Sequence, residues 1–232
     1  MNEAHLYFLE AAALRLAPLL DDIVFVGGAT LCLLITDSGA APPRATIDID
    51  VIAKISTYDE YNDFSKRLRR LGFSEDAREG ASICRWLHGD LVIDVMPLIK
   101  EVLGFSNRWY PGAFKSAQTI ILSGGQSIRS ISAPYFLATK VEAFRGRGSR
   151  DYYASRDLED VVAVIDGRQS ILEEIAAAPV DLRMYLAEAA KELLVVPRFH
   201  DALPGYLLPD EISQQRLASI LRRFQSITDL RN

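Results

Sequence analysis

Residues 46–53 read TIDIDVIA, in which apolar and polar side chains alternate with a period of two. This period predicts a β-strand, because successive side chains of a strand point to opposite faces. Asp48 and Asp50 would then project side by side from one face, and Ile47 and Ile49 would point into the opposite layer. Adjacent carboxylates repel each other unless water solvates them or a cation lies between them. The strand therefore predicts a cation site, with a solvated edge strand as the alternative.

The sequence before this strand supplies a second feature. IVFV at 23–26 is a short apolar run typical of a buried strand, and Gly27 and Gly28 follow it directly. The apolar residues 29–35 then predict a short helix that contains Thr30. Glycine lets a backbone approach a ligand closely, and a helix N-terminus offers free N–H groups to a phosphate. The turn predicts a phosphate-binding loop or, alternatively, a plain strand-to-helix connection.

A third aspartate, Asp94, lies inside the apolar run LVIDVM at 91–96. An unpaired carboxylate is costly to bury, so this position needs a partner. A neighbouring strand could place Asp94 beside Asp48 and Asp50, and three carboxylates are the oxygen ligands that Mg²⁺ or Mn²⁺ prefers. The alternative is an ion pair with Arg85 across the preceding hairpin.

The remaining sequence predicts a strand-rich part followed by a helical part. A first helix is expected at 3–20, and Ser56–Asp59 resembles a capping box that starts another. Further strands are expected at 81–87, 91–95, 118–122 and 126–131, and helices at 134–145, 156–166, 169–177, 180–195 and 210–229. We therefore expect an α+β fold: a small mixed β-sheet core with flanking helices in residues 1–132, followed by a helical domain in residues 133–232.

Together the runs FVGGATLCLL, RATIDIDVIA and LVIDVMPL resemble the nucleotidyltransferase superfamily whose best-known member is DNA polymerase beta. That family combines a glycine turn, Asp-x-Asp on one strand and a third aspartate on a later strand. The spacing Arg44-x-Thr46-x-Asp48-x-Asp50, with a helical C-terminal part, is similar to the AbiEii group of bacterial toxins. The interval from Gly28 to Asp48 is longer than the family pattern.

The resemblance implies transfer of a nucleoside monophosphate from an NTP to a hydroxyl of RNA or protein, as the toxin of a toxin–antitoxin system with an antitoxin protein as partner. It implies that Mg²⁺ or Mn²⁺ is bound by the catalytic residues Asp48, Asp50 and Asp94. It also implies that Gly27, Gly28 and Thr30 contact the nucleotide phosphates. Two other functions stay open: a non-catalytic nucleotide-binding protein, and a nucleotidyltransferase for antibiotic-type small molecules.

In the helical part, a lysine followed by Asp-x-x-Asp on the next helix also looks like the AbiEii arrangement. Lys140 and Asp157 are therefore expected to contact nucleotide. Arg145, Arg147 and Arg150 form a dense basic run with glycines, which predicts a phosphate contact. The alternative for this run is a solvated helix C-terminus.

Composition limits where such a protein acts. The 232 residues carry a formal net charge of −5, so the whole molecule does not attract nucleic acid and a local basic patch would be needed. The longest apolar runs fall short of the roughly 18 residues that span a membrane, so no membrane partner is expected. Cys32 and Cys84, each in an apolar run, are typical of buried reduced thiols, and the expected location is cytoplasmic.

Overall fold

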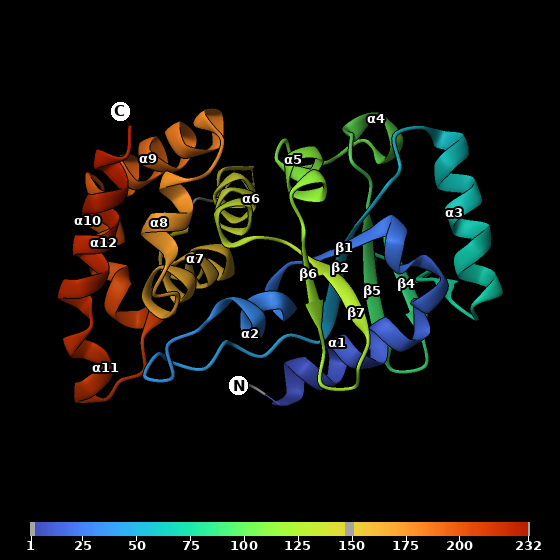
Figure 1. Ribbon diagram of the computed structural model, residues 1–232, viewed down its shortest axis with the longest axis horizontal. Helices are drawn as coiled ribbons and strands as arrows, with labels where there is room; N and C mark the ends of the chain where they lie inside the picture. The colour runs from blue at the N-terminus through green and yellow to red at the C-terminus, as the bar shows by residue number, and fades with distance from the viewer. Residues whose placement is uncertain (1–2, 147–150, 232) are drawn as a thin grey trace. The chain divides into compact units, whose positions relative to one another are not determined.

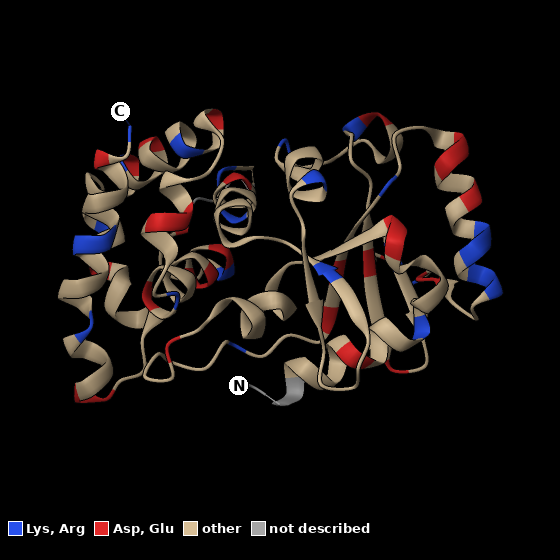
Figure 2. Ribbon diagram, viewed as in Figure 1, with Lys and Arg blue, Asp and Glu red and all other residues tan. Residues whose placement is uncertain are grey.

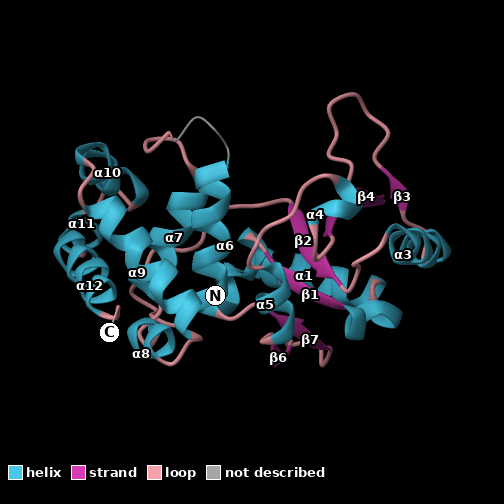
Figure 3. Ribbon diagram, turned by 90° about the horizontal axis from the view of Figure 1, so that it is seen from above, coloured by secondary structure: helices cyan, strands magenta, loops and turns pink. Residues whose placement is uncertain are grey.

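The chain, described in residues 3–146 and 151–231 of a computed structural model, divides into two compact units. All the described strands lie in one unit, whereas helices and loops build the other (Figure 3). We name them the sheet unit, residues 1–32 and 44–132, and the helical unit, residues 33–43 and 133–232. The expected α+β fold, a mixed sheet with flanking helices followed by helices, is confirmed.

Short elements alternate along the sheet unit (Figure 1). In chain order they are α1 (Glu3–Arg15), the 3-10 helix η1 (Ala17–Asp22), β1 (Ile23–Val26), the 3-10 helix η2 (Gly28–Thr30), β2 (Asp48–Ala53), α3 (Tyr58–Arg70), β3 (Ser74–Glu75), β4 (Arg85–His88), β5 (Leu91–Met96), α4 (Lys100–Leu103), α5 (Tyr110–Lys115), β6 (Gln118–Ile121) and β7 (Ser127–Ser130). Helix α2 (Leu31–Leu34) follows η2 and leads out of this unit.

The described strands form one seven-stranded sheet in the order β3-β4-β5-β2-β1-β7-β6. The central strand β2 pairs antiparallel with β1 and parallel with β5. On β2 and β5 the apolar residues Ile49, Val51, Ile93 and Val95 are buried on one face. Helix α1 packs against both strands. The acidic positions of these two strands consequently share the opposite face.

Several details of the sheet unit differ from the sequence prediction. Helix α1 ends at Arg15 rather than near residue 20, because Pro18 cannot donate the backbone hydrogen bond that an α-helix interior needs. The capping box is formed by Thr57 and Glu60, one residue later than expected, and both of its hydrogen bonds are present. The short elements β3, α4 and α5 are further additions to the predicted set.

The helical unit contains eight described elements. They are α6 (Ala133–Gly146), α7 (Arg156–Gly167), α8 (Ile171–Ala176), α9 (Val180–Leu194), α10 (Pro197–Ala202), the 3-10 helix η3 (Leu203–Tyr206), α11 (Glu211–Gln215) and α12 (Leu217–Asp229). The core contains buried side chains such as Phe136 of α6, Val161 of α7, Leu186 of α9 and Phe224 of α12. The single helix expected at 210–229 is divided into α11 and α12, and α10 is an addition to the predicted set.

The segment 33–43, which sequence reasoning assigns to the first domain, groups with the helical unit. The backbone amides of Thr36 and Asp37 both donate to the Gly167 carbonyl at 2.8 Å. Arg216 contacts Asp37 at 2.6 Å, and the Arg168 guanidinium donates to the Leu34 carbonyl at 2.9 Å. Contacts this distant in sequence leave no local pattern, so a boundary drawn from composition alone misses them. Among the described residues no helix has the length and apolarity to cross a bilayer.

Candidate active site

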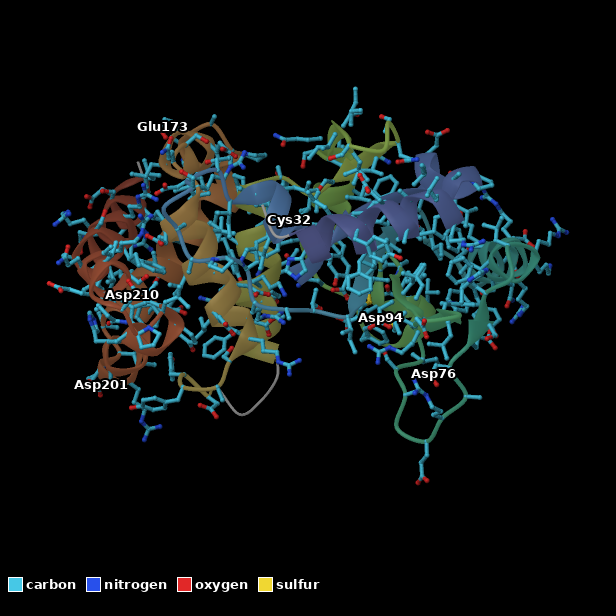
Figure 4. The ribbon with its side chains drawn as sticks, turned by 90° about the horizontal axis from the view of Figure 1, so that it is seen from below. Cys32, Asp76, Asp94, Glu173, Asp201 and Asp210 are labelled. Carbon is cyan, nitrogen blue, oxygen red and sulfur yellow. The ribbon has the colours of Figure 1, made fainter. Side chains whose placement is uncertain are left out.

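The three aspartates predicted as a group lie on neighbouring strands. In the parallel pairing of β2 with β5, Asp50 is the register partner of Asp94, and Asp48 lies two residues earlier on the same face. Figure 2 shows these acidic positions on β2 and β5, and Figure 4 labels Asp94 among the side chains of this sheet. Ile47, expected to be buried opposite them, precedes the strand and is 73% exposed.

Arg85 connects two of these carboxylates. It is the register partner of Asp94 across the β4–β5 hairpin. Its Nε and Nη2 donate to the two Asp94 oxygens at 2.8 and 2.7 Å, a bidentate pair. The same Nη2 lies 3.3 Å from Asp48 Oδ2. The ion pair that the sequence leaves as the alternative for Asp94 is therefore present, and it extends to Asp48.

The carboxylates at this face stabilise the charged form of the Arg85 guanidinium. The Asp94 side chain is 9% exposed and that of Asp48 is 35% exposed, so the pair runs from the interior of the sheet to solvent. Hydrogen bonding to Asp94 and the charge of Asp48 raise the pKa of Arg85 against the opposing effect of burial. Burial, aided by the charges of Asp94 and Asp50, raises the pKa of the Cys84 thiol to about 11. Cys84 is thus a neutral neighbour of the carboxylates at pH 7.

The glycine turn lies directly against Asp50. Gly27 has a φ of +70°, which L side chains rarely adopt. A Cβ placed on it would lie 1.9 Å from Asp50 Oδ2, closer than any real contact allows. Strand β1 pairs Val26 with Asp50, so the turn begins where the acidic pair lies. A side chain at position 27 and the observed Asp50 conformation exclude each other.

Thr30, another residue expected to contact phosphate, instead forms hydrogen bonds within the turn. Thr30 is fully buried, and its hydroxyl and amide both contact the Gly27 carbonyl, at 2.8 and 3.1 Å. The helix after the glycines is a single 3-10 turn followed by the four residues of α2. A helix this short has a weak dipole, so the glycine backbone, rather than a long helix, is what the turn offers to a ligand.

The donor set fits a hard divalent cation in chemistry, because all three groups are carboxylates. Within the described residues, however, no group of three or more His, Cys, Asp or Glu is arranged to hold a metal ion. The contacts of Arg85 explain this result, since they direct both Asp94 oxygens toward the guanidinium. Thr46 donates to Asp48 Oδ1 at 2.5 Å and orients it.

The lysine and aspartates expected in the second part meet inside the helical unit. Lys140 Nζ of α6 lies 2.7 Å from Asp160 and 3.5 Å from Asp157, both on α7. The two aspartates are buried, and Lys140 also lies over the Phe136 ring. The predicted pattern of a helix lysine followed by Asp-x-x-Asp therefore forms one buried charge cluster.

The basic run at 145–150 is described only in part. Arg145 pairs with Glu192 of α9 and lies over the Tyr185 ring, with 4.9 Å from its guanidinium carbon to the ring centroid. These contacts give Arg145 a packing role at the end of α6. Arg147 and Arg150 lie outside the described residues.

Comparison with solved structures identifies proteins of the same fold. JHP933 from Helicobacter pylori matches with a TM-score of 0.51 and 14% identity over 98% of this chain and 92% of that one. A candidate nucleotidyltransferase from H. pylori matches with a TM-score of 0.52 and 15% identity over 98% and 95%. An antigenic nucleotidyltransferase-like protein from Paracoccidioides brasiliensis is 18% identical over 87% and 93%, with a TM-score of 0.48.

Comparison by sequence adds nothing to this. No family model matches the chain, and no curated protein matches it. At these identities the structural likeness shows the fold alone, which this chain shares with JHP933 and with the candidate nucleotidyltransferase from H. pylori.

Proposed function

We propose that this chain transfers a nucleoside monophosphate from an NTP to a hydroxyl group of an RNA or protein acceptor. The acceptor oxygen forms a bond to the α-phosphorus, and the bond from that phosphorus to the oxygen bridging to the β-phosphate breaks. Pyrophosphate leaves, and the hydroxyl proton passes to solvent. The observation that carries this proposal is the shared strand face of Asp48, Asp50 and Asp94, with Gly27 packed against Asp50.

Each group of this face has a separate part in the proposal. Asp48 and Asp50 would hold Mg²⁺ or Mn²⁺, which when bound neutralises the charge of the phosphates during in-line displacement. The turn at Gly27 and Gly28 would let phosphate oxygens approach the backbone beside Asp50. Arg85 holds Asp94 and Asp48 in place through ion pairs.

Label transfer tests the proposal directly. The protein is incubated with each α-³²P-labelled NTP, Mg²⁺ or Mn²⁺, and total cellular RNA or protein. We expect one polymer to become labelled, and Asp50→Asn to reduce labelling by about 100-fold or more, because removing a metal ligand forfeits several kcal/mol of transition-state stabilisation. Asp90→Asn, the same substitution at an exposed position of the β4–β5 turn, is the matched control and should label normally.

A second readout separates loss of chemistry from loss of fold. Replacing Asp50 by asparagine removes one of several neighbouring negative charges, so the metal-free variant should melt no lower than the wild type. Absence of label with every NTP and both cations would refute the transferase proposal. A lower melting temperature of D50N would instead make the carboxylate structural.

A toxin role for the transferase is tested by comparing expression of the wild type with expression of D50N. If the acceptor is cellular RNA or protein, expression of the wild type should arrest bacterial growth, and expression of D50N should not. Growth arrest by both variants would separate toxicity from transfer. A neighbouring protein that relieves the arrest would be the expected antitoxin.

One observation favours a second candidate, nucleotide binding without turnover. Arg85 already neutralises Asp94, so the site carries less negative charge than three free carboxylates would. In that case the protein would bind NTP in equilibrium measurements, yet no acceptor would become labelled.

A further inference from the structure

Helix α1 is apolar on its outer side as well as on the side that packs against the sheet. The inner side is buried at Leu9, Ala12 and Ala13. On the outer side Tyr7 is 69% exposed and Leu14 is 59% exposed, and their spacing places them on one face, two turns apart. A helix that meets water on one side is expected to carry polar residues there. Two large apolar residues in these positions indicate that the outer side of α1 contacts another surface.

A hollow of about 310 Å³ lies beside the outer side of α1. Its lining residues are Tyr7, Phe8, Ala11 and Arg15 of α1 and residues 88–91 of the β4–β5 turn. The rings of Tyr7 and Phe8 meet edge to face, with 5.8 Å between their centroids. One wall of the hollow is therefore largely apolar and aromatic, which suits a large apolar side chain from a partner.

The charges around the hollow favour a second copy of this chain as that partner. Arg15 and Asp90 contribute one positive and one negative charge to the lining. A nucleic acid or an anionic membrane surface would require a face rich in lysine and arginine. A face with one charge of each sign is complementary to itself, because a two-fold axis can bring each charge near its opposite in the other copy.

We propose that two copies of this chain form a dimer through the outer side of α1, with the two α1 helices antiparallel across a two-fold axis near Ala11. Positions equally far from this axis then meet, so Tyr7 lies against Arg15 of the other copy, and Phe8 against Leu14. A guanidinium over a tyrosine ring is favourable, and the small side chain of Ala11 lets the helices approach closely. The acidic positions of β2 and β5 lie on the sheet face opposite the apolar residues that α1 covers, so the dimer leaves them open.

Sedimentation velocity of the full chain tests the dimer. The 13 residues of α1 are about 20 Å long, so a single helix pair buries less than a standard interface, and we expect a dissociation constant on the order of 10–100 µM. The sedimentation coefficient of the wild type should therefore rise between about 2 and 400 µM. Leu14→Asp should weaken the dimer at least about tenfold, because the interface would bury an unpaired charge.

Val180→Asp is the matched control for Leu14→Asp. Val180 is also 59% exposed and also belongs to a helix, α9 of the helical unit, so V180D should dimerise as the wild type does. Both substitutions are at exposed positions, and melting followed by circular dichroism should show that both variants fold.

A cross-link tests the position of the two-fold axis. Ala11→Cys should form an interchain disulfide under mild oxidation, because the axis brings the two copies of this residue within reach of each other. The wild type should not, since Cys32 and Cys84 are buried. Ser116→Cys, at an exposed position of the sheet unit, measures cross-linking by random collision.

The outcomes that contradict the dimer are distinct from one another. A wild type that stays monomeric up to the highest concentration would overturn the proposal, and binding of that monomer to anionic vesicles would assign the outer side of α1 to a membrane. Dimers that persist undiminished in L14D would overturn the assignment to α1. Cross-linking of A11C no faster than that of S116C would overturn the antiparallel pairing.

Discussion

Gly27 is the residue on which the local geometry of the candidate site depends most. Its φ of +70° disfavours any L side chain, and Asp50 Oδ2 lies 1.9 Å from the position that a Cβ would occupy. Gly27→Ala should destabilise the protein by about 3 kcal/mol, which combines the cost of placing alanine in a backbone conformation essentially confined to glycine with displacement of the Asp50 carboxylate. Urea denaturation followed by circular dichroism measures this loss.

Gly125 is the matched position for that substitution. It has a φ of +84°, but nothing lies within 4 Å of the place where its Cβ would be. Gly125→Ala should therefore cost only the backbone strain, about 1 kcal/mol. If G27A proved no more costly than G125A, Asp50 would move away freely, and the close packing of turn and carboxylate would have no energetic meaning.

The residues of the site are predictable to the extent that their contacts are local or periodic. The spacing of Asp48 and Asp50 places them on one face, because the period of a strand is fixed. A turn at Gly89 and Asp90 sets the hairpin register and brings Arg85 opposite Asp94, so that pair could be anticipated. The contact of Arg85 with Asp48 could not be anticipated in the same way, because it depends on a side-chain conformation that reaches past Asp94 to the next strand, and local sequence does not specify it.

Helices α6 and α7 are joined by a buried charge cluster. Lys140 lies 2.7 Å from Asp160 and 3.5 Å from Asp157, and the side chains of all three are at most 12% exposed. Lys140→Met should lower the free energy of unfolding by about 3 kcal/mol, because it removes the cation from two buried carboxylates. Chemical denaturation measures this change, and NTP binding to the folded variant is measured in parallel.

An exposed lysine provides the comparison for Lys140. Lys66 pairs with Asp63 at 2.8 Å, but both side chains are more than half exposed. Lys66→Met should change stability by less than about 0.5 kcal/mol, since solvent screens such pairs. If K140M were as stable as K66M but lost affinity for NTP, the cluster would serve nucleotide binding rather than helix packing.

At the level of whole elements, sequence reasoning succeeds where periodicity or caps extend over several residues. The apolar run at 23–26 and the alternation of residues 46–53 correspond to β1 and β2. The two residues of β3 are too few to show a strand period, and the six residues of α5 fall short of two helical turns. Their formation depends on what they pack against, and a single sequence does not contain that information.

The chain passes between its two units three times, after residues 32, 43 and 132. Residues 33–43 lie in sequence between the glycine turn and the strand of Asp48 and Asp50. The backbone amides of Thr36 and Asp37 nevertheless donate to Gly167 in the helical unit. Arg216 of this unit forms ion pairs with both Asp37 and Asp166, and it thereby links residues 33–43 to α7. A segment flanked on both sides by candidate site residues is therefore bonded to helix α7.

Amide hydrogen exchange can show whether residues 33–43 open together with the helical unit or with the sheet unit. Leu186 of α9 and Ile93 of β5 are both buried, one in each unit. Replacing either by alanine should cost about 3 kcal/mol in its own core. Exchange reports local opening, so the amides of Thr36 and Asp37, which donate to Gly167, should exchange faster in L186A and stay unchanged in I93A.

The strands provide the opposite comparison within the same experiment. Amides of β2 and β5 should exchange faster in I93A and should be unaffected by L186A, because their partners lie within the sheet. If instead Thr36 and Asp37 followed the sheet mutation, residues 33–43 would open with the strands they connect, and the bonds to Gly167 would be too weak to hold them. Acceleration of all amides by both mutations would show that the two units unfold as one, since neither could then open while the other stays closed.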